Sequence, residues 1–374
     1  MNPDSTPRSQ HDQSGALKIK SLLREEWQHL IRISPSDRPW QMPLAAAFAS
    51  GLPLLVGAFF DRMDFGQVSS LGGLVFLYLP RTPLYHRMVS LMVCAFAITA
   101  CYAFGLMSHF FPPLMVPVLT LVAVLVTMLC RFYALGPPSS LFFLMAAAIG
   151  AYTPLRAVEL LPQMVGLIAL GALLACLIGF FYSMYILRLR VPLPVDPLPT
   201  PSFDYVVFDA VIIGACVGIS LALAQMLGLQ RPYWVPVSCL TVIHGASLRA
   251  VWTRQVHRVI GTAIGLLPAW AIFMLPLNPW TLSVAMMALT FIVETAIVRH
   301  YAFAAIFITP LTLLLAEAAT IGQAPAGELI ASRFFDTALG SFVGLIGGIA
   351  LHNPAFRRVV GAQIRRWMPS RFGG

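Results

Sequence analysis

The chain has 374 residues, of which 58% are hydrophobic and only 10% are charged, with a formal net charge of +9. Soluble globular chains are about 45–50% apolar and about 25% charged, so this composition excludes a soluble enzyme, a secreted disulfide scaffold and a disordered chain. The apolar residues lie in long runs, which predict an all-α polytopic membrane protein.

Twelve apolar segments follow one another along the chain. They cover residues 40–60, 67–79, 88–107, 112–130, 138–153, 160–187, 205–228, 233–247, 259–276, 279–298, 302–317 and 333–351. Most approach the ~20 residues that a helix needs to cross a bilayer core. The second, fifth, eighth and eleventh segments are shorter or broken by glycine and proline, so we expect short or broken helices there.

The basic residues predict the orientation. With the N-terminus inside, twenty of the 24 lysines and arginines fall on the cytoplasmic side, and the outer face keeps Arg62, Arg156, Arg231 and Arg333. Cytoplasmic loops of membrane proteins are enriched in these residues. We therefore expect twelve transmembrane helices with both termini in the cytoplasm. The positive charge then needs no nucleic-acid partner.

Two segments flank the spans. Residues 1–39 form a cytoplasmic N-terminal segment, in which residues 16–33 place apolar and basic side chains at helical spacing. This pattern predicts an amphipathic helix on the membrane surface, which either braces the bundle or has a regulatory role. Residues 352–374 form a basic cytoplasmic tail, which we expect close to anionic lipid headgroups.

The chain also repeats itself. At an offset of 169, Arg62, Phe65, Val68, Ser69 and Leu71 match Arg231, Trp234, Val237, Ser238 and Leu240. Four further matches follow in the same order at offsets of 168 to 171. Residues 40–187 and 205–351 are therefore predicted to be two six-span repeats, joined by a Pro-rich cytoplasmic linker at 188–204. Because six is even, both copies cross in the same direction, and we expect a fused pseudo-dimer with its two-fold axis along the membrane normal.

The second repeat carries three motifs in order. They are an aromatic–Trp segment at Tyr233 and Trp234, an Arg-x-x-Gly-Thr-x-x-Gly helix start at Arg258, and an Arg-x-x-Asp-Thr-x-x-Gly final helix at Arg333. This order resembles the membrane unit of the fusaric acid resistance and aromatic acid exporter family. In the first repeat Arg87 lacks the Gly-Thr pair, so the resemblance is degenerate there.

The resemblance implies a function. Family members export small, often aromatic, carboxylic acids across the inner membrane, frequently with a periplasmic adaptor protein. The large cytosolic domain common in that family has no counterpart in this sequence. Plant anion channels of the malate type look similar in the six-span unit, where they assemble as dimers.

Matching basic and aromatic residues of the two repeats are candidates for the substrate path. Arg131 and Arg299 end the fourth and tenth spans and are followed by Tyr133 and Tyr301. An arginine can hold a carboxylate by its guanidinium fork, and an aromatic side chain can stack on a ring. As an alternative, both arginines snorkel to lipid headgroups and set the topology.

Two further sets of matched residues are weaker candidates. The pairs His86–Arg87 and His257–Arg258 would gather anions at the cytoplasmic side. Phe65 and Trp234 occupy matching positions on the outer face, where an interfacial aromatic belt would also account for them.

Glu294 is the candidate for coupling transport to an ion gradient. It lies inside the tenth span, five residues before Arg299, and its counterpart in the first repeat is the apolar Val126. A carboxyl at membrane depth is costly and is a functional candidate by default, but Glu294 could equally serve as the intramembrane partner of an arginine. Asp209 and Asp336 are weaker cases, and an ion pair with Arg333, one turn away, would account for Asp336.

No catalytic or cofactor motif is present. The sequence has no HExxH, GxSxG or Walker pattern, and its six cysteines form no CxxC pair, so we expect neither an enzyme, a cofactor nor a metal. The prediction is an ion-gradient-driven exporter of small amphipathic organic acids. A passive organic-anion channel of the same fold and a non-transporting scaffold for an envelope complex stay open as alternatives, as do the substrate and the oligomeric state.

Overall fold

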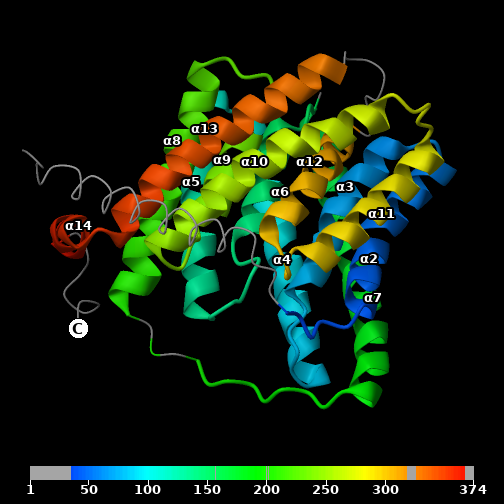
Figure 1. Ribbon diagram of the computed structural model, residues 1–374, viewed down its shortest axis with the longest axis horizontal. Coiled ribbons are helices and arrows are strands. Elements are labelled where there is room, and N and C mark those ends of the chain that lie inside the picture. The colour runs from blue at the N-terminus through cyan, green and yellow to red at the C-terminus, as the bar shows by residue number, and fades with distance from the viewer. Residues whose placement is uncertain (1–34, 156, 199, 201, 318–325, 367–374) are drawn as a thin grey trace, which may run out of the picture.

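A computed structural model of the chain describes residues 35–155, 157–198, 200, 202–317 and 326–366. The amphipathic helix expected at residues 16–33 lies outside this part of the chain. Within the described residues every regular element is helical and there is no strand. The all-helical prediction is therefore confirmed (Figure 1).

The helices follow the predicted segments closely. The first half contains α2 (Gln41–Phe59), α3 (Met63–Gly73) with the 3-10 turn η1 (Leu74–Tyr78), α4 (Leu84–His109), α5 (Pro112–Phe132), α6 (Leu141–Tyr152), η2 (Val158–Leu160) and α7 (Leu161–Leu189). The second half contains the π-helical turn η3 (Asp204–Phe208), α8 (Asp209–Met226), α9 (Trp234–Ile243), α10 (Leu248–Phe273), α11 (Pro279–Ala296), α12 (Tyr301–Glu317) and α13 (Ala326–His352), followed by α14 (Pro354–Arg366). Each of the twelve predicted segments thus contains a helix.

Not all of these helices have the length to cross a bilayer. Among the described residues, eight stretches are long and apolar enough, namely α2, α4, α5, α7 with η2, α8 with η3, α10, α11 and α13. Apart from the polar helix α14, the shorter α-helices are α3, α6, α9 and α12, which have 10 to 17 residues. They fall on the four segments that the sequence marks as short, and at 1.5 Å per residue α9 extends only about 15 Å. Twelve crossings therefore stay a prediction.

The start of α11 shows how local sequence sets a helix boundary. Pro279 opens the helix, where a missing N–H costs no hydrogen bond. The side chain of Asn278 accepts from the backbone N–H groups of Trp280 at 3.0 Å and Thr281 at 2.9 Å, and the Thr281 hydroxyl accepts from the backbone of Asn278 at 2.9 Å. This reciprocal capping box ends the short connection from α10.

Corresponding helices of the two halves have corresponding neighbours. In the first half α4 packs on α6 and α7, and α3 packs on α7. In the second half α10 packs on α12 and α13, and α9 packs on α13. The halves meet through α2 with α11 and through α5 with α8, on opposite sides of the bundle in Figure 1.

This pattern is what a two-fold arrangement requires. By their order in the two halves, α2 corresponds to α8 and α5 to α11. A two-fold axis generates each contact between the halves twice, so it relates the α2–α11 interface to the α8–α5 interface. The packing agrees with a two-fold relation between the halves, while the two six-span repeats, their parallel orientation and their superposition stay predictions.

Two glycines at equivalent positions allow the closest helix contacts. Gly171 of α7 lies against the backbone of Ser69 in α3, and Gly340 of α13 lies against Val235 and Ser238 of α9. A Cβ atom at either glycine would collide with a backbone carbonyl oxygen of the facing helix. Glycine is therefore needed at both positions so that a short helix can pack against the final long helix of its half.

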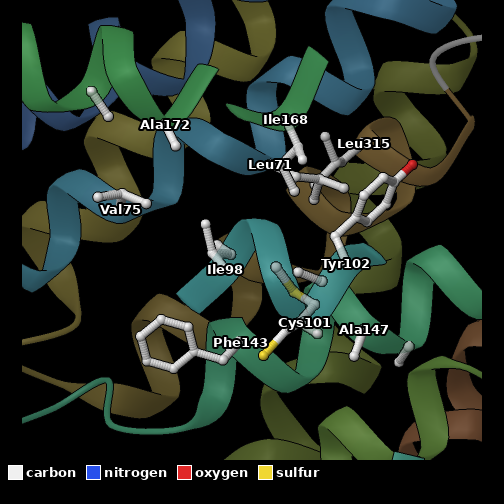
Figure 2. Packing of buried hydrophobic residues seen from close by; sticks show 14 of the residues in the cluster. Leu71, Val75, Ile98, Cys101, Tyr102, Phe143, Ala147, Ile168, Ala172 and Leu315 are labelled. Carbon is white, nitrogen blue, oxygen red and sulfur yellow. The ribbon is translucent and has the colours of Figure 1, made fainter. Parts of the chain in front are cut away.

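The apolar core has two main parts. The larger one includes residues of both halves. Leu71, Ile98, Tyr102 and Phe143 are buried among α3, η1, α4, α6 and α7 (Figure 2), and buried side chains of α9, α11 and α12 belong to the same cluster. In the smaller one, apolar side chains of η3, α8 and α9 pack against Phe356, Val360 and Ile364 of α14. The basic tail thus begins with a helix that packs on the protein, and its proximity to lipid stays a prediction.

The glycine contacts generate a stability prediction. Gly171→Ala and Gly340→Ala should each destabilise the folded protein by about 1–3 kcal/mol, because the added methyl group overpacks a helix contact. Thermal unfolding in detergent would measure the loss. Gly166, on the same helix as Gly171, has no neighbouring atom within 4 Å of an added Cβ. Gly166→Ala should therefore be neutral or slightly stabilising, and equal destabilisation by all three changes would contradict the packing explanation.

Candidate functional site

A group of buried polar side chains lies where α9, α10 and α13 meet. We call it the α13 cluster, and its members are Trp234 of α9, Arg258 of α10, and Arg333, Asp336, Thr337 and Ser341 of α13. The four residues of α13 are spaced by three, one and four positions, which places them on one face of the helix. Arg333 is 2% exposed and Asp336 is fully buried.

The arginines of the cluster are held by aromatic and polar contacts. The guanidinium carbon of Arg333 lies 4.1 Å from the centroid of the Trp234 ring, which is a cation–π contact. Arg258 donates from Nη2 to the Ser238 hydroxyl at 3.4 Å. Since Ser238 also faces Gly340, the close α9–α13 contact brings the two arginines to one region, where they interact electrostatically.

Most polar atoms of the cluster have no hydrogen-bond partner among the residues that the structure describes. They are Nε and Nη1 of Arg333, Nε of Arg258, Nε1 of Trp234, both carboxyl oxygens of Asp336, and the hydroxyls of Thr337 and Ser341. In particular, the oxygens of Asp336 accept no hydrogen bond from Arg333. A hydrogen-bonded ion pair between these two residues, one helical turn apart, therefore does not account for Asp336. Buried polar atoms are normally satisfied, and leaving one unpaired is costly.

The charge of the region is positive. The carboxyl of Asp336 interacts electrostatically with Arg333 and with Arg231, in the loop before α9. Two arginines, Arg231 and Arg333, thus act on the Asp336 carboxyl, and a third, Arg258, acts on Arg333. Unpaired guanidinium donors in a low-dielectric interior favour an anionic group that accepts hydrogen bonds from two of them.

A second contact joins α10 to α12 next to the cluster. The rings of His257 and Tyr301 lie parallel within 24°, with centroids 6.4 Å apart, and His300 lies 5.4 Å from His257. The buried hydroxyl of Tyr301 has no hydrogen-bond partner among the described residues. Of the predicted path residues, the structure therefore brings together Trp234 with Arg258, and His257 with Tyr301.

The first half has no equivalent of the polar cluster. Phe65 matches Trp234, but the side chain over its ring is that of Arg62, at 3.5 Å, which is exposed. At the offset of 169, the counterparts of Arg333, Asp336, Thr337 and Ser341 are Met164, Leu167, Ile168 and Ala172. The site is thus confined to the second half.

The predicted His86–Arg87 pair is engaged within its own half. The Arg87 side chain is buried and donates from Nε to the Thr82 carbonyl at 2.6 Å and from Nη1 to the Ser183 hydroxyl at 3.5 Å. A 2.8 Å hydrogen bond joins the Thr82 hydroxyl to His86. These contacts satisfy Arg87, in contrast to its counterpart Arg258.

Arg131 and Arg299 lie at different interfaces. Arg131, at the end of α5, pairs with Asp209 of α8 at 2.6 Å and lies 4.5 Å over the Tyr205 ring. Arg299 is exposed beyond the end of α11, and Tyr133 is also exposed. The α5–α8 and α2–α11 interfaces stand apart in the bundle (Figure 1). A path shared by both arginines stays a prediction that these contacts do not support.

Glu294 has a partner from the other half. Its buried carboxyl accepts from Nη1 of Arg38, just before α2, at 3.1 Å, and the same nitrogen donates to the Glu294 carbonyl at 3.2 Å. The neighbouring Asp37 pairs with Arg81 at 2.9 Å, and this hydrogen bond lowers the pKa of the Asp37 carboxyl. These contacts join the segment before α2 to the loop before α4 and to the C-terminal end of α11.

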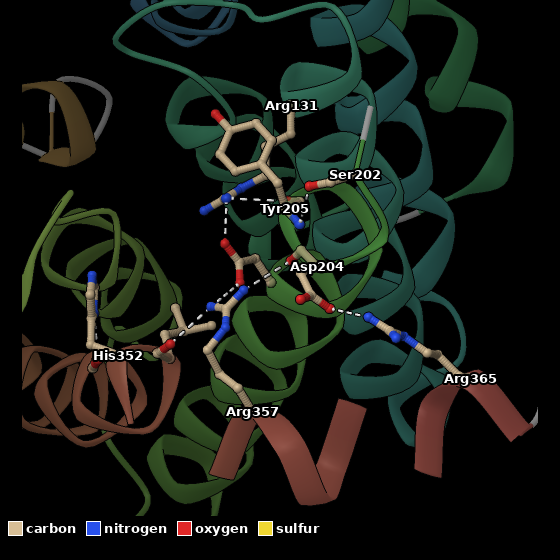
Figure 3. Close-up of polar contacts among 10 residues, drawn as sticks. Arg131, Ser202, Asp204, Tyr205, His352, Arg357 and Arg365 are labelled. Carbon is tan, nitrogen blue, oxygen red and sulfur yellow. Dashed lines mark hydrogen bonds and ion pairs between the residues drawn. The ribbon is translucent and has the colours of Figure 1, made fainter. Parts of the chain in front are cut away.

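The two ion pairs have reversed polarity. At the α5–α8 interface the end of α5 carries the arginine, Arg131, whereas at the α2–α11 interface the end of the equivalent helix, α11, carries the carboxylate, Glu294. Asp209 accepts a second arginine, Arg357 of α14, at 2.9 Å, and Arg365 pairs with Asp204 at 2.8 Å (Figure 3). The α2–α11 and α5–α8 interfaces are therefore each fastened by a charge pair.

Comparison with known proteins finds similarity to one family and to another membrane protein. Residues 212–347 match the family model described as fusaric acid resistance protein-like. The family resemblance is confirmed. The matched region contains every residue of the α13 cluster. A relative, the uncharacterized membrane protein YvaC of Bacillus subtilis (strain 168), is 22% identical over 468 aligned positions, covering 86% of this chain and 74% of the relative. No solved structure matches the chain.

The sequence contained a signal for the residues that it did not single out. By sequence, Arg333 falls among the outer-face charges and Thr337 in the third motif, and neither of these residues nor Ser341 is predicted for the substrate path. In the fusaric acid resistance protein-like region these three residues and Asp336 are polar where the first repeat is apolar.

In the described chain no three His, Cys, Asp or Glu residues come together as a metal site would need.

The ion pair of Asp209 generates a second stability prediction. Asp209→Asn leaves Arg131 and Arg357 without their carboxylate and should destabilise the protein by about 3–5 kcal/mol, as expected for breaking a buried pair. Asp204→Asn removes an exposed pair, with side chains about half exposed, and should cost less than about 1 kcal/mol. Thermal unfolding in detergent compares them, and a loss at Asp204 as large as at Asp209 would rule out the interface explanation.

Proposed function

We propose that this membrane protein exports small amphipathic organic acids, aromatic ones included, across a bacterial inner membrane. The match to the fusaric acid resistance protein-like family and the apolar helices support a transporter. The observation that carries the substrate class is the α13 cluster, in which two buried arginines with unpaired donors lie beside Trp234.

The cluster has the chemistry to recognise an aromatic carboxylate. The guanidinium groups of Arg258 and Arg333 would bind the carboxylate, since charge-assisted hydrogen bonds are the strongest available to it. The Trp234 indole offers an apolar face for a ring and an N–H donor for a substituent. The hydroxyls of Thr337 and Ser341 would accept or donate further hydrogen bonds. The cluster would therefore bind an amphipathic organic acid more tightly than an inorganic anion.

The remaining parts of the proposal concern topology and energy. Twelve crossings with both termini in the cytoplasm agree with the distribution of arginines. An ion gradient would drive export, with Glu294 as the coupling residue, and a periplasmic adaptor protein would carry the acid onward.

Transport by the cluster is directly testable. In proteoliposomes loaded with labelled benzoate, Arg258→Gln and Arg333→Gln should each lower the rate at least tenfold, because each removes one charged donor (about 1.4 kcal/mol or more of binding). Arg358→Gln changes an exposed arginine of α14 and is the matched control. Wild-type rates in both cluster variants would remove the cluster from the path. A rate of benzoate efflux that does not depend on an imposed pH gradient would favour a passive channel.

The coupling role of Glu294 has its own test. Glu294→Gln should abolish the accumulation of benzoate driven by a pH gradient while leaving benzoate binding intact, because the amide keeps the shape but cannot titrate. Accumulation is measured in proteoliposomes with and without the gradient. Arg38→Gln breaks the same ion pair and leaves the carboxyl in place. If the two variants behave alike, the ion pair is structural and Glu294 does not couple transport.

A further inference from the structure

The buried carboxyl groups of this protein differ in their partners. Glu294 is bound by Arg38, and Asp209 is bound by Arg131 and Arg357. Asp336 is fully buried, and neither of its oxygens has a hydrogen-bond partner among the described residues. Of these three carboxyls, Asp336 is therefore the one whose charge is not fixed by a direct ion pair.

The surroundings of Asp336 are strongly basic. The titratable or charged residues that face Asp336 or its helix are Arg333 on α13, Arg231 and Tyr233 before α9, Cys239 on α9, Arg258 on α10, and Cys216 on α8. His257, next to Arg258, packs instead on His300 and Tyr301. The two cysteines lie opposite Gly344 and Gly347, two to three turns further along α13. The arginines therefore dominate the electrostatics of the Asp336 carboxyl.

An anion in this cluster changes the balance of charge. While the arginines have no other anion, the negative charge of Asp336 is favourable because it offsets theirs. A carboxylate bound to Arg258 and Arg333 takes over that role and adds a second negative charge close to Asp336. Two carboxylates that share a small site of low dielectric do not both stay ionised, and one of them takes a proton.

We propose that Asp336 takes up a proton when an organic anion binds to Arg258 and Arg333, so that anion and proton occupy the site together. The proposal rests on the function proposed above and adds a protonation step to the same site. The proton comes from water or buffer and bonds to a carboxyl oxygen of Asp336, and no other bond is made or broken. The occupied site then carries no more net charge than the unoccupied one, which keeps the cost of moving it through an apolar bundle low.

The repeat sets the stoichiometry. Because Met164 and Leu167 stand at the positions of Arg333 and Asp336 in the first half, the chain has one such site. We therefore expect one anion and one proton per chain, although the chain contains two copies of the six-span unit.

Calorimetry on the purified full chain in detergent tests this inference, with benzoate as the probe. Titrations in two buffers with different ionisation enthalpies give the number of protons taken up per benzoate. The wild type should take up about one proton per benzoate over part of the range from about pH 6 to about pH 8. In that range its affinity for benzoate should fall up to about tenfold for each unit by which the pH rises. Asp336→Asn should bind benzoate without proton uptake and without pH dependence. Asp196→Asn makes the same change at an exposed position of the linker and should behave as wild type.

The outcomes separate this inference from the function it rests on. Benzoate binding that needs Arg258 and Arg333 but takes up no proton, or takes one up equally in Asp336→Asn, overturns the role of Asp336 and leaves the proposed function standing. Absence of benzoate binding, or binding that Arg258→Gln and Arg333→Gln leave unchanged, overturns the site itself. Infrared difference spectra of the wild type give an independent reading if Asp336→Asn fails to fold. A protonated carboxyl band that appears with benzoate supports the proposal, and its absence counts against it.

Discussion

An arginine inside a bundle of apolar helices needs a counter-charge, and this protein provides one in two different ways. At the interfaces between the halves the arginines are paired directly, Arg38 with Glu294 and Arg131 with Asp209. In the α13 cluster the donors of Arg258 and Arg333 are only partly satisfied within the described chain. The paired charges fasten helices, and the unpaired ones leave binding energy for an anion, because a hydrogen bond already made inside the protein is not available to a ligand.

The same constraint explains why two similar halves have different chemistry. Both use a glycine contact between a short helix and the final long helix, Gly171 with Ser69 and Gly340 with Ser238. In the first half the residues around that contact on α7 are apolar, so the helices form a larger continuous core. In the second half they are polar and carry charge. At the same helix junction the fold thus accommodates either apolar packing or a polar site. Four side chains of the final long helix decide which of the two forms.

The sequence predicts the elements well because each depends on local chemistry. Every apolar segment contains a helix, and the short helices occur where glycine and proline interrupt the runs. Trp234 and Arg258 are predicted as path residues because each matches an aromatic or basic residue of the first repeat, whereas Arg333 matches the apolar Met164 and is assigned to the outer face. The partner of Glu294 could not be predicted. Arg38 is 256 positions away, and the two meet only because α2 packs on α11, which no local pattern determines.

The shared carboxylate of Asp209 has a consequence for biosynthesis. Arg131 is made before Asp209, so this pair can form as soon as α8 enters the membrane. Arg357 lies 148 positions after Asp209 and becomes available only when α14 emerges from the ribosome. During that interval five helices of the second half, α9 to α13, are inserted while the η3 turn has no α14 packed against it. A chain terminated before Arg357 would keep the first ion pair but lack the contacts of Phe356 and Arg357 with Phe208, and would be more open to quality-control proteases at η3.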